Sequence, residues 1–186
     1  MHRDRVFGYS LFELLVTIGI AVLVLSLGLP SFGSLVAEHR LRVEVDALFH
    51  AMHLARKESI MRRRVVTLCP SRDGLSCVPG DDWSHGWIMF VNLDRDLPAA
   101  RDPGEPVLRA HAASSHNQVF ANRQSFSFRA TQLRATNGTL LFCDKARRAA
   151  PRALVVSHTG RARVSRTDSR GRPRACPDYV KLMSPL

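Results

Sequence analysis

The sequence predicts an α+β protein in which one long N-terminal helix packs on a small antiparallel β-domain. Three observations support this class. Residues 9–29 form an apolar run with a single charge, Glu13. Apolar side chains then recur at helical spacing between Leu41 and Ala55. The remainder consists of short apolar runs separated by turn residues, without parallel βαβ alternation. A length of 186 residues, 45% of them hydrophobic, fits one domain with an appendage.

The first expected element is a membrane-spanning helix. A helix over residues 9–29 would be roughly 30 Å long, enough for a bilayer core. Arg3 and Arg5 precede it, so its N-terminal end should face the cytoplasm. The run is longer than the apolar part of an ordinary secretory signal, and no A-x-A-like cleavage site follows it. A plain membrane anchor is the simplest alternative.

Glu13 is unusual because an acid within an apolar span is costly without a partner. If the chain were cut between Gly8 and Tyr9, the new amine would lie four residues before Glu13 and could neutralise it on a neighbouring subunit. Residues 8–15, Gly-Tyr-Ser-Leu-Phe-Glu-Leu-Leu, resemble the type III signal of type IV pilins and type II secretion pseudopilins. The resemblance implies a pilin-like fold, cleavage after Gly8 and N-methylation of Tyr9 by a prepilin peptidase, and a role for Glu13 in assembly.

The same resemblance implies a location. The chain would be held by a single span in inner-membrane lipid, with its globular domain in the periplasm, before it joins other major and minor pilins in a type IV pilus.

Pro30 should kink the helix or end its membrane half. Beyond it, the helix should run to about Arg62, with an apolar stripe facing the globular domain. This stripe consists of Leu41, Val45, Leu48, Met52 and Ala55. The predicted organisation is a leader at 1–8, a transmembrane or fibre-core half of the helix at 9–30, an amphipathic half at 31–62, and a globular β-domain with a basic C-terminal region at 63–186.

The β-domain is predicted from eight short strands. Glycine, proline and an Asn-Gly pair separate them, which is typical of turns. The predicted strands are residues 64–69, 87–92, 106–111, 117–120, 125–130, 139–143, 153–157 and 162–166.

Four cysteines indicate an extracytoplasmic domain with two disulfides. Cys69 and Cys77 would close a short loop, which leaves Cys143 and Cys176 for the second bridge. Four cysteines allow three connectivities, so the other pairings stay open. A zinc site is the rival interpretation, but the spacing lacks a C-x2-C pair.

Two further segments resemble one family. Residues 83–90, Trp-Ser-His-Gly-Trp-Ile-Met-Phe, resemble the W-x-x-G-W-x-x-F segment of the FimT/GspH family, and residues 160–163, Gly-Arg-Ala-Arg, match the G-R-x-R motif of FimT-like minor pilins. The resemblance implies a FimT-like minor type IV pilin whose G-R-x-R motif binds incoming DNA during natural transformation. Pseudopilins of the GspH type share the fold and act at the tip of a type II secretion pseudopilus, so the family leaves both functions open.

The formal net charge of +11 is concentrated between Lys145 and Arg174, where Asp168 is the only acid. A hairpin turning at Gly160 would place Arg161 and Arg163 on one face of a strand. Arg166 would point to the other face unless the strand has already ended. Arginine binds phosphate in a bidentate manner, so such a face is suited to a DNA backbone without reading its sequence.

Residues 167–174 would form a flexible arm, tied back if Cys176 is bridged. The residues predicted to contact DNA are Gly160, Arg161, Arg163, Arg166, Arg170, Arg172, Arg174, Arg152 and Arg148. The alternatives are a solvated basic face, or one that meets anionic lipid or an acidic pilin.

No catalytic, cofactor or metal site is predicted. His50 and His53 lie three residues apart on the helix but lack a third ligand at a suitable spacing. Residues 92–96 are faintly similar to a calcium loop but lack its glycine and its final glutamate. Neither a nucleophile elbow nor a phosphate-cradling glycine loop is present.

Overall fold

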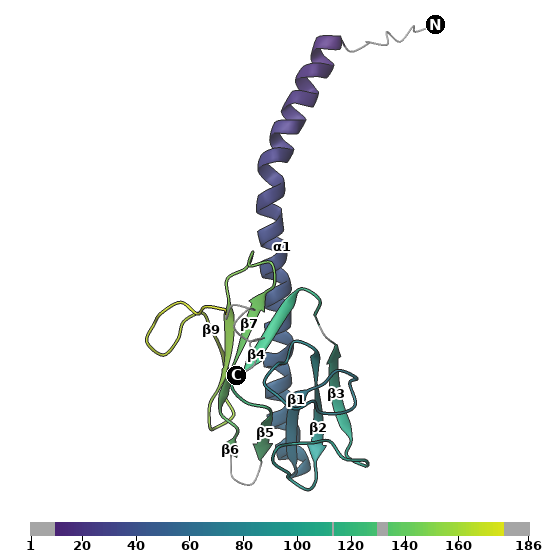
Figure 1. The fold of residues 1–186 in the computed structure, drawn as a ribbon, viewed down its shortest axis with the longest axis vertical. Coiled ribbons are helices and arrows are strands. Elements are labelled where there is room, and N and C mark those ends of the chain that lie inside the picture. The colour runs from purple at the N-terminus through teal and green to yellow at the C-terminus, as the bar shows by residue number, and fades with distance from the viewer. Residues whose placement is uncertain (1–9, 113, 130–133, 177–186) are drawn as a thin grey trace, which may run out of the picture. The chain divides into compact units, whose positions relative to one another are not determined.

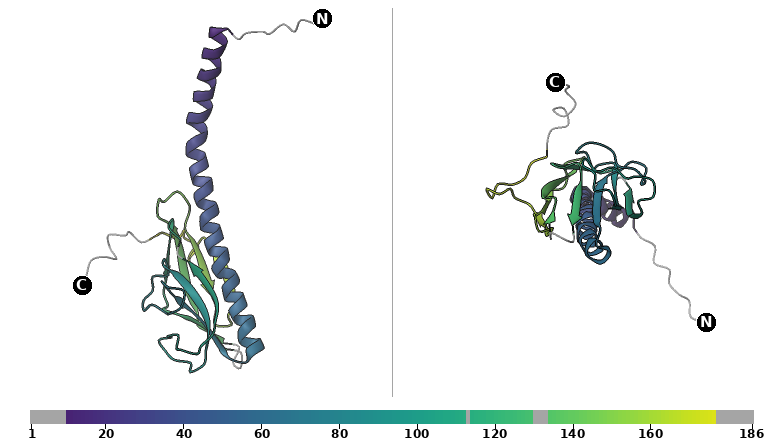
Figure 2. Two further views of the ribbon diagram at one scale, coloured as in Figure 1. Left: turned by 90° about the vertical axis from the view of Figure 1, so that its right-hand side faces the viewer. Right: turned by 90° about the horizontal axis from the view of Figure 1, so that it is seen from below.

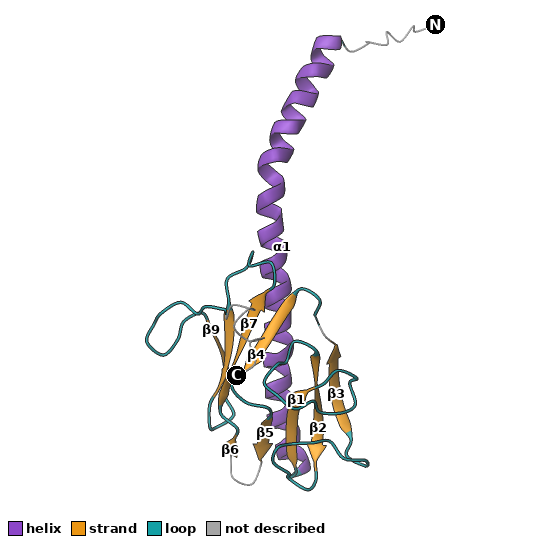
Figure 3. Ribbon diagram, in the orientation of Figure 1, coloured by secondary structure: helices purple, strands orange, loops and turns teal. Residues whose placement is uncertain are grey.

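The computed structural model describes residues 10–112, 114–129 and 134–176. The chain divides into two compact units, Met1–Val36 and Ala37–Leu186. One helix, α1 (Leu11–Arg62), belongs to both (Figure 3). It ends at Arg62, as predicted, and it continues through Pro30, where a kink or the end of the membrane half stays a prediction.

The first unit contains the start of α1. Ser10 caps the helix: its hydroxyl oxygen accepts a hydrogen bond from the Glu13 amide at 3.2 Å, and its carbonyl accepts one from the Leu14 amide at 3.1 Å. Within the described residues, no helix is long and apolar enough to cross a membrane. The span expected at residues 9–30 therefore stays a prediction. Gly8 and Tyr9, the predicted processing residues, lie outside the described residues.

In the second unit, the C-terminal part of α1 packs on the β-domain (Figure 2). The predicted stripe from Leu41 to Ala55 is at most 1% exposed. It shares one core cluster with buried side chains of the domain. The largest of these are Trp83, Trp87, Phe126, Phe128 and Phe142. Burial of this stripe stabilises the packing of the helix on the sheets.

The β-domain consists of two antiparallel sheets (Figure 1). The first has the order β3-β2-β1-β5-β6 and the second the order β4-β7-β8-β9. The strands of the first sheet are β1 (Val65–Pro70), β2 (Gly86–Asn92), β3 (Val107–Ala112), β5 (Phe126–Arg129) and β6 (Arg134–Ala135). Those of the second are β4 (Asn117–Ala121), β7 (Gly138–Asp144), β8 (Arg152–Val156) and β9 (Ala162–Ser165). All eight predicted strands are present, with ends shifted by no more than one residue, and β6 was not predicted.

Two disulfides join the predicted pairs, Cys69–Cys77 and Cys143–Cys176. The first closes a loop that Asp73 organises. Hydrogen bonds from the Ser76 hydroxyl, and then from nearby amides, hold the pKa of Asp73 far below its usual range. The second attaches the C-terminal segment to the end of β7.

Candidate nucleic-acid interface

The G-R-x-R motif lies at the turn between β8 and β9. Val155 pairs with Arg163 across this hairpin. The turn closes through hydrogen bonds from the Ser157 amide to the Arg161 carbonyl at 3.0 Å and from the Gly160 amide to the Ser157 carbonyl at 2.9 Å. Gly160 adopts a φ of 74°, a left-handed conformation that glycine tolerates best. The hairpin predicted from the sequence is therefore present, with its glycine in the turn.

The turn packs against the first sheet at its β5–β6 end. Gly160 is buried, and a Cβ atom there would lie 3.2 Å from the Phe128 ring and 3.3 Å from the Ala135 Cβ. The Ala135 amide donates a hydrogen bond to the His158 carbonyl at 2.8 Å. The turn is thus held in place by the other sheet, and only glycine allows this close approach. This contact holds in place the start of the segment that carries Arg161 and Arg163.

Arg161 and Arg163 lie on the outer side of the second sheet. Leu154 and Val156 of β8 belong to the core, so the alternate position at Val155 and its partner Arg163 point outward. Arg161 has the same parity as Arg163, and both are exposed. No described residue forms an ion pair with either side chain. Two cations are therefore available to an external anion, as the hairpin pattern predicted.

Arg152 and Arg166 have the opposite orientation and are already paired. Both contact Glu38 of α1, with Nη2 to Oε1 distances of 2.6 Å for Arg152 and 3.5 Å for Arg166. The hydrogen bond from Arg152, followed by the charges of Arg152, Arg166 and Arg42, lowers the pKa of Glu38 against the effect of burial. These two pairs hold the basic region against the helix. The part of Arg152 and Arg166 in DNA binding stays a prediction. No local pattern could indicate this role of Glu38, because 114 and 128 residues separate it from Arg152 and Arg166.

The segment predicted as a flexible arm forms a hydrogen-bonded loop. The Asp168 carboxylate accepts hydrogen bonds from the amides of Arg172 and Arg170 at 2.9 and 2.8 Å and from the Arg172 guanidinium at 2.9 Å. The backbone hydrogen bond from Arg172 is the main cause of the lowered pKa of Asp168. The Arg174 amide bonds the Arg166 carbonyl at 3.1 Å, which closes the loop. The arm is tied back through the Cys143–Cys176 bridge, as predicted. The sequence showed Asp168 only as the single acid of the region, and the hydrogen bonds that it accepts were not predicted.

Two other predicted contacts, Arg170 in this loop and Arg148 in the turn before β8, have exposed side chains without an ion pair in the described part of the chain. Arg172, in contrast, pairs with Asp168.

Within residues 10–112, 114–129 and 134–176, no group of His, Cys, Asp and Glu could hold a metal ion. His50 and His53 pack beside Phe49, with ring centroids 5.5 and 4.5 Å away. The chemistry that the region offers is anion binding by arginine.

Acid should weaken the attachment of the basic region to α1. A carboxylate whose pKa is lowered in the folded state stabilises the fold above its unfolded pKa, and this stability is lost as the pH falls through the folded value. For Glu38 the loss begins below the ordinary pKa of 4.5. Denaturant unfolding at decreasing pH should show that acid lowers the free energy of unfolding less in Glu38→Gln than in the wild type. Glu58→Gln, which removes an exposed ion pair with Arg62 on the same helix, is the matched control. Equal acid dependence in Glu38→Gln and the wild type would contradict this role.

One long helix whose C-terminal part packs on antiparallel sheets is the fold of pilins and pseudopilins. The chain belongs to the GspH family, because the family model described as type II transport protein GspH matches residues 44–160. No curated protein sequence matches it. The motif at Trp83 and Trp87 lies within the matched region, where both rings are buried.

Three solved structures are similar to this chain. One crystal form of the type IV minor pilin FimU from Pseudomonas aeruginosa strain PAO1 is 20% identical, with a TM-score of 0.50 over 75% of this chain and 96% of FimU. A second FimU crystal form gives 20% identity and a TM-score of 0.49 over 73% of this chain and 99% of FimU. The minor pseudopilin EpsH from the type 2 secretion system of Vibrio cholerae is 9% identical, with a TM-score of 0.48 over 67% of this chain and 94% of EpsH.

Proposed function

We propose that the chain is a FimT-like minor type IV pilin that binds DNA and supports its uptake in natural transformation. The observation that carries the proposal is the outward hairpin pair, Arg161 and Arg163, exposed and without an ion-pair partner in the described residues. Arg170 and Arg148 add two more cations from neighbouring segments of the sequence. A set of free guanidiniums on ordered backbone suits the bidentate geometry of phosphate.

The binding is proposed to be independent of base sequence. The region contains exposed cations, and its only aromatic residue in the described part after Phe142 is His158. It therefore lacks the Phe, Tyr and Trp rings on which single-stranded bases usually stack. Contacts that neutralise phosphates release counterions, so affinity should fall steeply with salt.

Removing the hairpin cations should weaken DNA binding and flatten its salt dependence. Arg161→Gln/Arg163→Gln leaves polar side chains that can still form hydrogen bonds, although shorter ones, and removes two charges. The slope of log affinity against log salt should fall by about 1.8, at roughly 0.9 per phosphate contact on B-form DNA. Fluorescence anisotropy of the full chain in non-ionic detergent, with duplexes of two unrelated sequences, measures this. An unchanged slope in the double variant would remove the assigned role of the hairpin.

The proposal includes the processing of the protein and its location in the membrane before it binds DNA. A prepilin peptidase cuts after Gly8 and methylates Tyr9. Inner-membrane lipid holds the helix, the globular domain lies in the periplasm, and Glu13 contributes to assembly with other pilins. The protein is a structural and binding component rather than an enzyme, and it uses no cofactor.

A second function is favoured by the family description, which names a type II transport protein. In that case the chain is a GspH-type pseudopilin, or a structural minor pilin, that primes or caps a fibre without binding DNA. The genomic neighbourhood distinguishes the two: competence and pilus genes favour the first function, and a secretion operon favours the second.

A further inference from the structure

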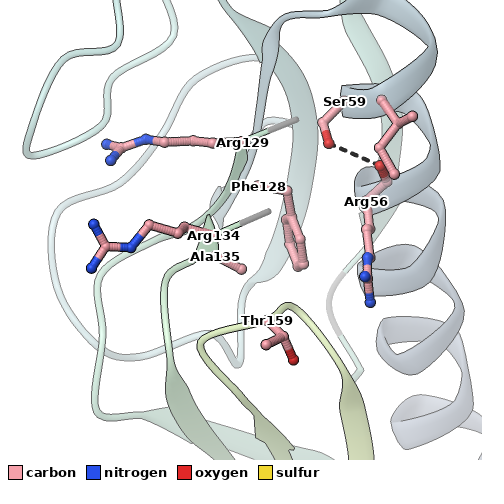
Figure 4. Close-up of a pocket in the computed structure, with 8 residues that line it drawn as sticks. Arg56, Ser59, Phe128, Arg129, Arg134, Ala135 and Thr159 are labelled. Carbon is pink, nitrogen blue, oxygen red and sulfur yellow. Dashed lines mark hydrogen bonds between the residues drawn. The ribbon is translucent and has the colours of Figure 1, made fainter. Parts of the chain in front are cut away.

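A second pair of arginines lies on the first sheet, outside the predicted basic region. Arg129 of β5 and Arg134 of β6 are directly opposite each other in the antiparallel register. The next pair in that register, Phe128 and Ala135, faces the core, so the two arginines point to the other side of the sheet. Figure 4 shows both side chains extended in the same direction, away from Phe128 and from Arg56 of α1.

This arrangement is unfavourable without an anion. Like charges directly opposite on neighbouring strands destabilise a sheet. Arg134 is exposed and Arg129 is partly exposed, and no carboxylate of the described residues forms an ion pair with either. Two guanidiniums at cross-strand distance can both donate to one phosphate, or to two phosphates next to each other on a strand.

The pair is attached to the G-R-x-R turn. Arg134 immediately precedes Ala135, whose amide bonds the His158 carbonyl at 2.8 Å. Gly160, between His158 and Arg161, would bring a Cβ to 3.3 Å from the Ala135 Cβ. The two hairpins are therefore in direct contact through a backbone hydrogen bond. Arg134 adjoins Ala135 and lies opposite Arg129, and Arg161 directly follows Gly160.

We propose that Arg129 and Arg134 form a second phosphate clamp, which continues the DNA contact of Arg161 and Arg163 from the second sheet onto the first. The inference rests on the proposed function and extends it. One duplex crosses the junction of the two sheets and meets a pair of arginines on each side. The clamp contacts phosphates only and contributes affinity without sequence preference.

The test compares charge-matched variants of the full chain in non-ionic detergent. Arg129→Gln/Arg134→Gln removes two charges from the clamp. Arg72→Gln/Arg109→Gln is the control and also removes two exposed charges. Arg72 lies in the Cys69–Cys77 loop, and Arg109 lies in β3, at the opposite edge of the first sheet. Circular dichroism melting verifies that both variants are folded. Duplex binding is then measured by anisotropy across a salt series.

If the clamp binds phosphates, the slope of log affinity against log salt should fall by about 1.8 in Arg129→Gln/Arg134→Gln. It should change little in Arg72→Gln/Arg109→Gln. Combining the clamp and hairpin variants should lower the slope by about 3.6, since the two pairs contact different phosphates. If Arg161→Gln/Arg163→Gln reduces binding while the clamp variant behaves like the Arg72/Arg109 control, the clamp is refuted and the proposed function remains. If the wild type does not bind duplex at low salt, both are refuted. A loss of binding to anionic vesicles, with duplex binding intact, assigns the pair to lipid and overturns the clamp.

The same pair makes a prediction in the absence of DNA. Relief of the like-charge contact should raise the melting temperature of Arg134→Gln above that of the wild type at low salt, and added salt should reduce the difference. A lower melting temperature that does not depend on salt would show that the arginines are not in repulsion, and would overturn the electrostatic basis of the clamp.

Discussion

Replacing Gly160 by alanine should lower the free energy of unfolding by roughly 2–5 kcal/mol and should also weaken DNA binding. Two costs combine. A residue with a Cβ pays for the left-handed conformation at φ 74°, about 1–2 kcal/mol. The new methyl group would also lie 3.2 Å from the ring of Phe128, which is 1% exposed and cannot move freely, at a cost of roughly 1–3 kcal/mol. Denaturant unfolding measures the stability, and anisotropy with duplex DNA measures the binding.

Gly171 offers a matched control for this substitution. Its φ of 76° is nearly the same, but a Cβ there would meet no atom within 4 Å. Gly171→Ala should therefore show only the conformational cost, and the difference between the two variants isolates the packing of the turn on Phe128 and Ala135. Equal destabilisation in the two variants would mean that the first sheet does not hold the turn in place.

Removing the Cys143–Cys176 bridge should produce the second large effect. The bridge joins residues 33 apart in the sequence, and the chain-entropy relation gives a loss of about 3.7 kcal/mol for a loop of this length. The loop that carries Arg170 would lose its attachment to β7, so DNA affinity should fall as well. Cys143→Ser/Cys176→Ser is compared with the wild type by denaturant unfolding under oxidising conditions and by duplex binding.

The other disulfide provides the control. Cys69 and Cys77 are only 8 residues apart, for which the same relation gives about 2.5 kcal/mol. Cys69→Ser/Cys77→Ser should thus be destabilised somewhat less and should bind DNA as the wild type does. If both double variants lost DNA affinity equally, the effect would reflect general unfolding, and the C-terminal loop would have no specific part in binding.

Local patterns predicted most of the fold, because the elements concerned are specified locally. The helical spacing of Leu41 to Ala55 defines an apolar stripe that does not depend on how the strands are arranged. Short apolar runs bounded by turn residues define the eight predicted strands. The strand β6 has only two residues, Arg134–Ala135, and exists through pairing with β5, so its own sequence carries no strand pattern. The division into two sheets depends on long-range pairing and was likewise beyond a sequence pattern.

In the candidate site, too, local features were predicted and long-range contacts were not. Residue parity along the predicted strand 162–166 and its hairpin predicted that Arg161 and Arg163 share a face, since alternation along a strand is a local property. Arg166 directly follows β9, which ends at Ser165. It did not predict that Glu38 would engage Arg166, because that contact spans most of the chain. The Arg129 and Arg134 pair was missed for a related reason. Charge was sought in a continuous basic stretch, whereas these two cations come together only in the fold.

The measurement that tests the central claim most directly is made in the bacterium that produces this chain. DNA uptake and fibre assembly are scored in the same cells carrying Arg161→Gln/Arg163→Gln on the chromosome, next to cells with the Arg72→Gln/Arg109→Gln control. If the hairpin binds DNA for uptake, uptake falls sharply in the first strain while surface fibres and protein secretion stay at the wild-type level. Unchanged uptake, or a parallel loss of fibres or secretion, would contradict the claim and leave a component of fibre assembly.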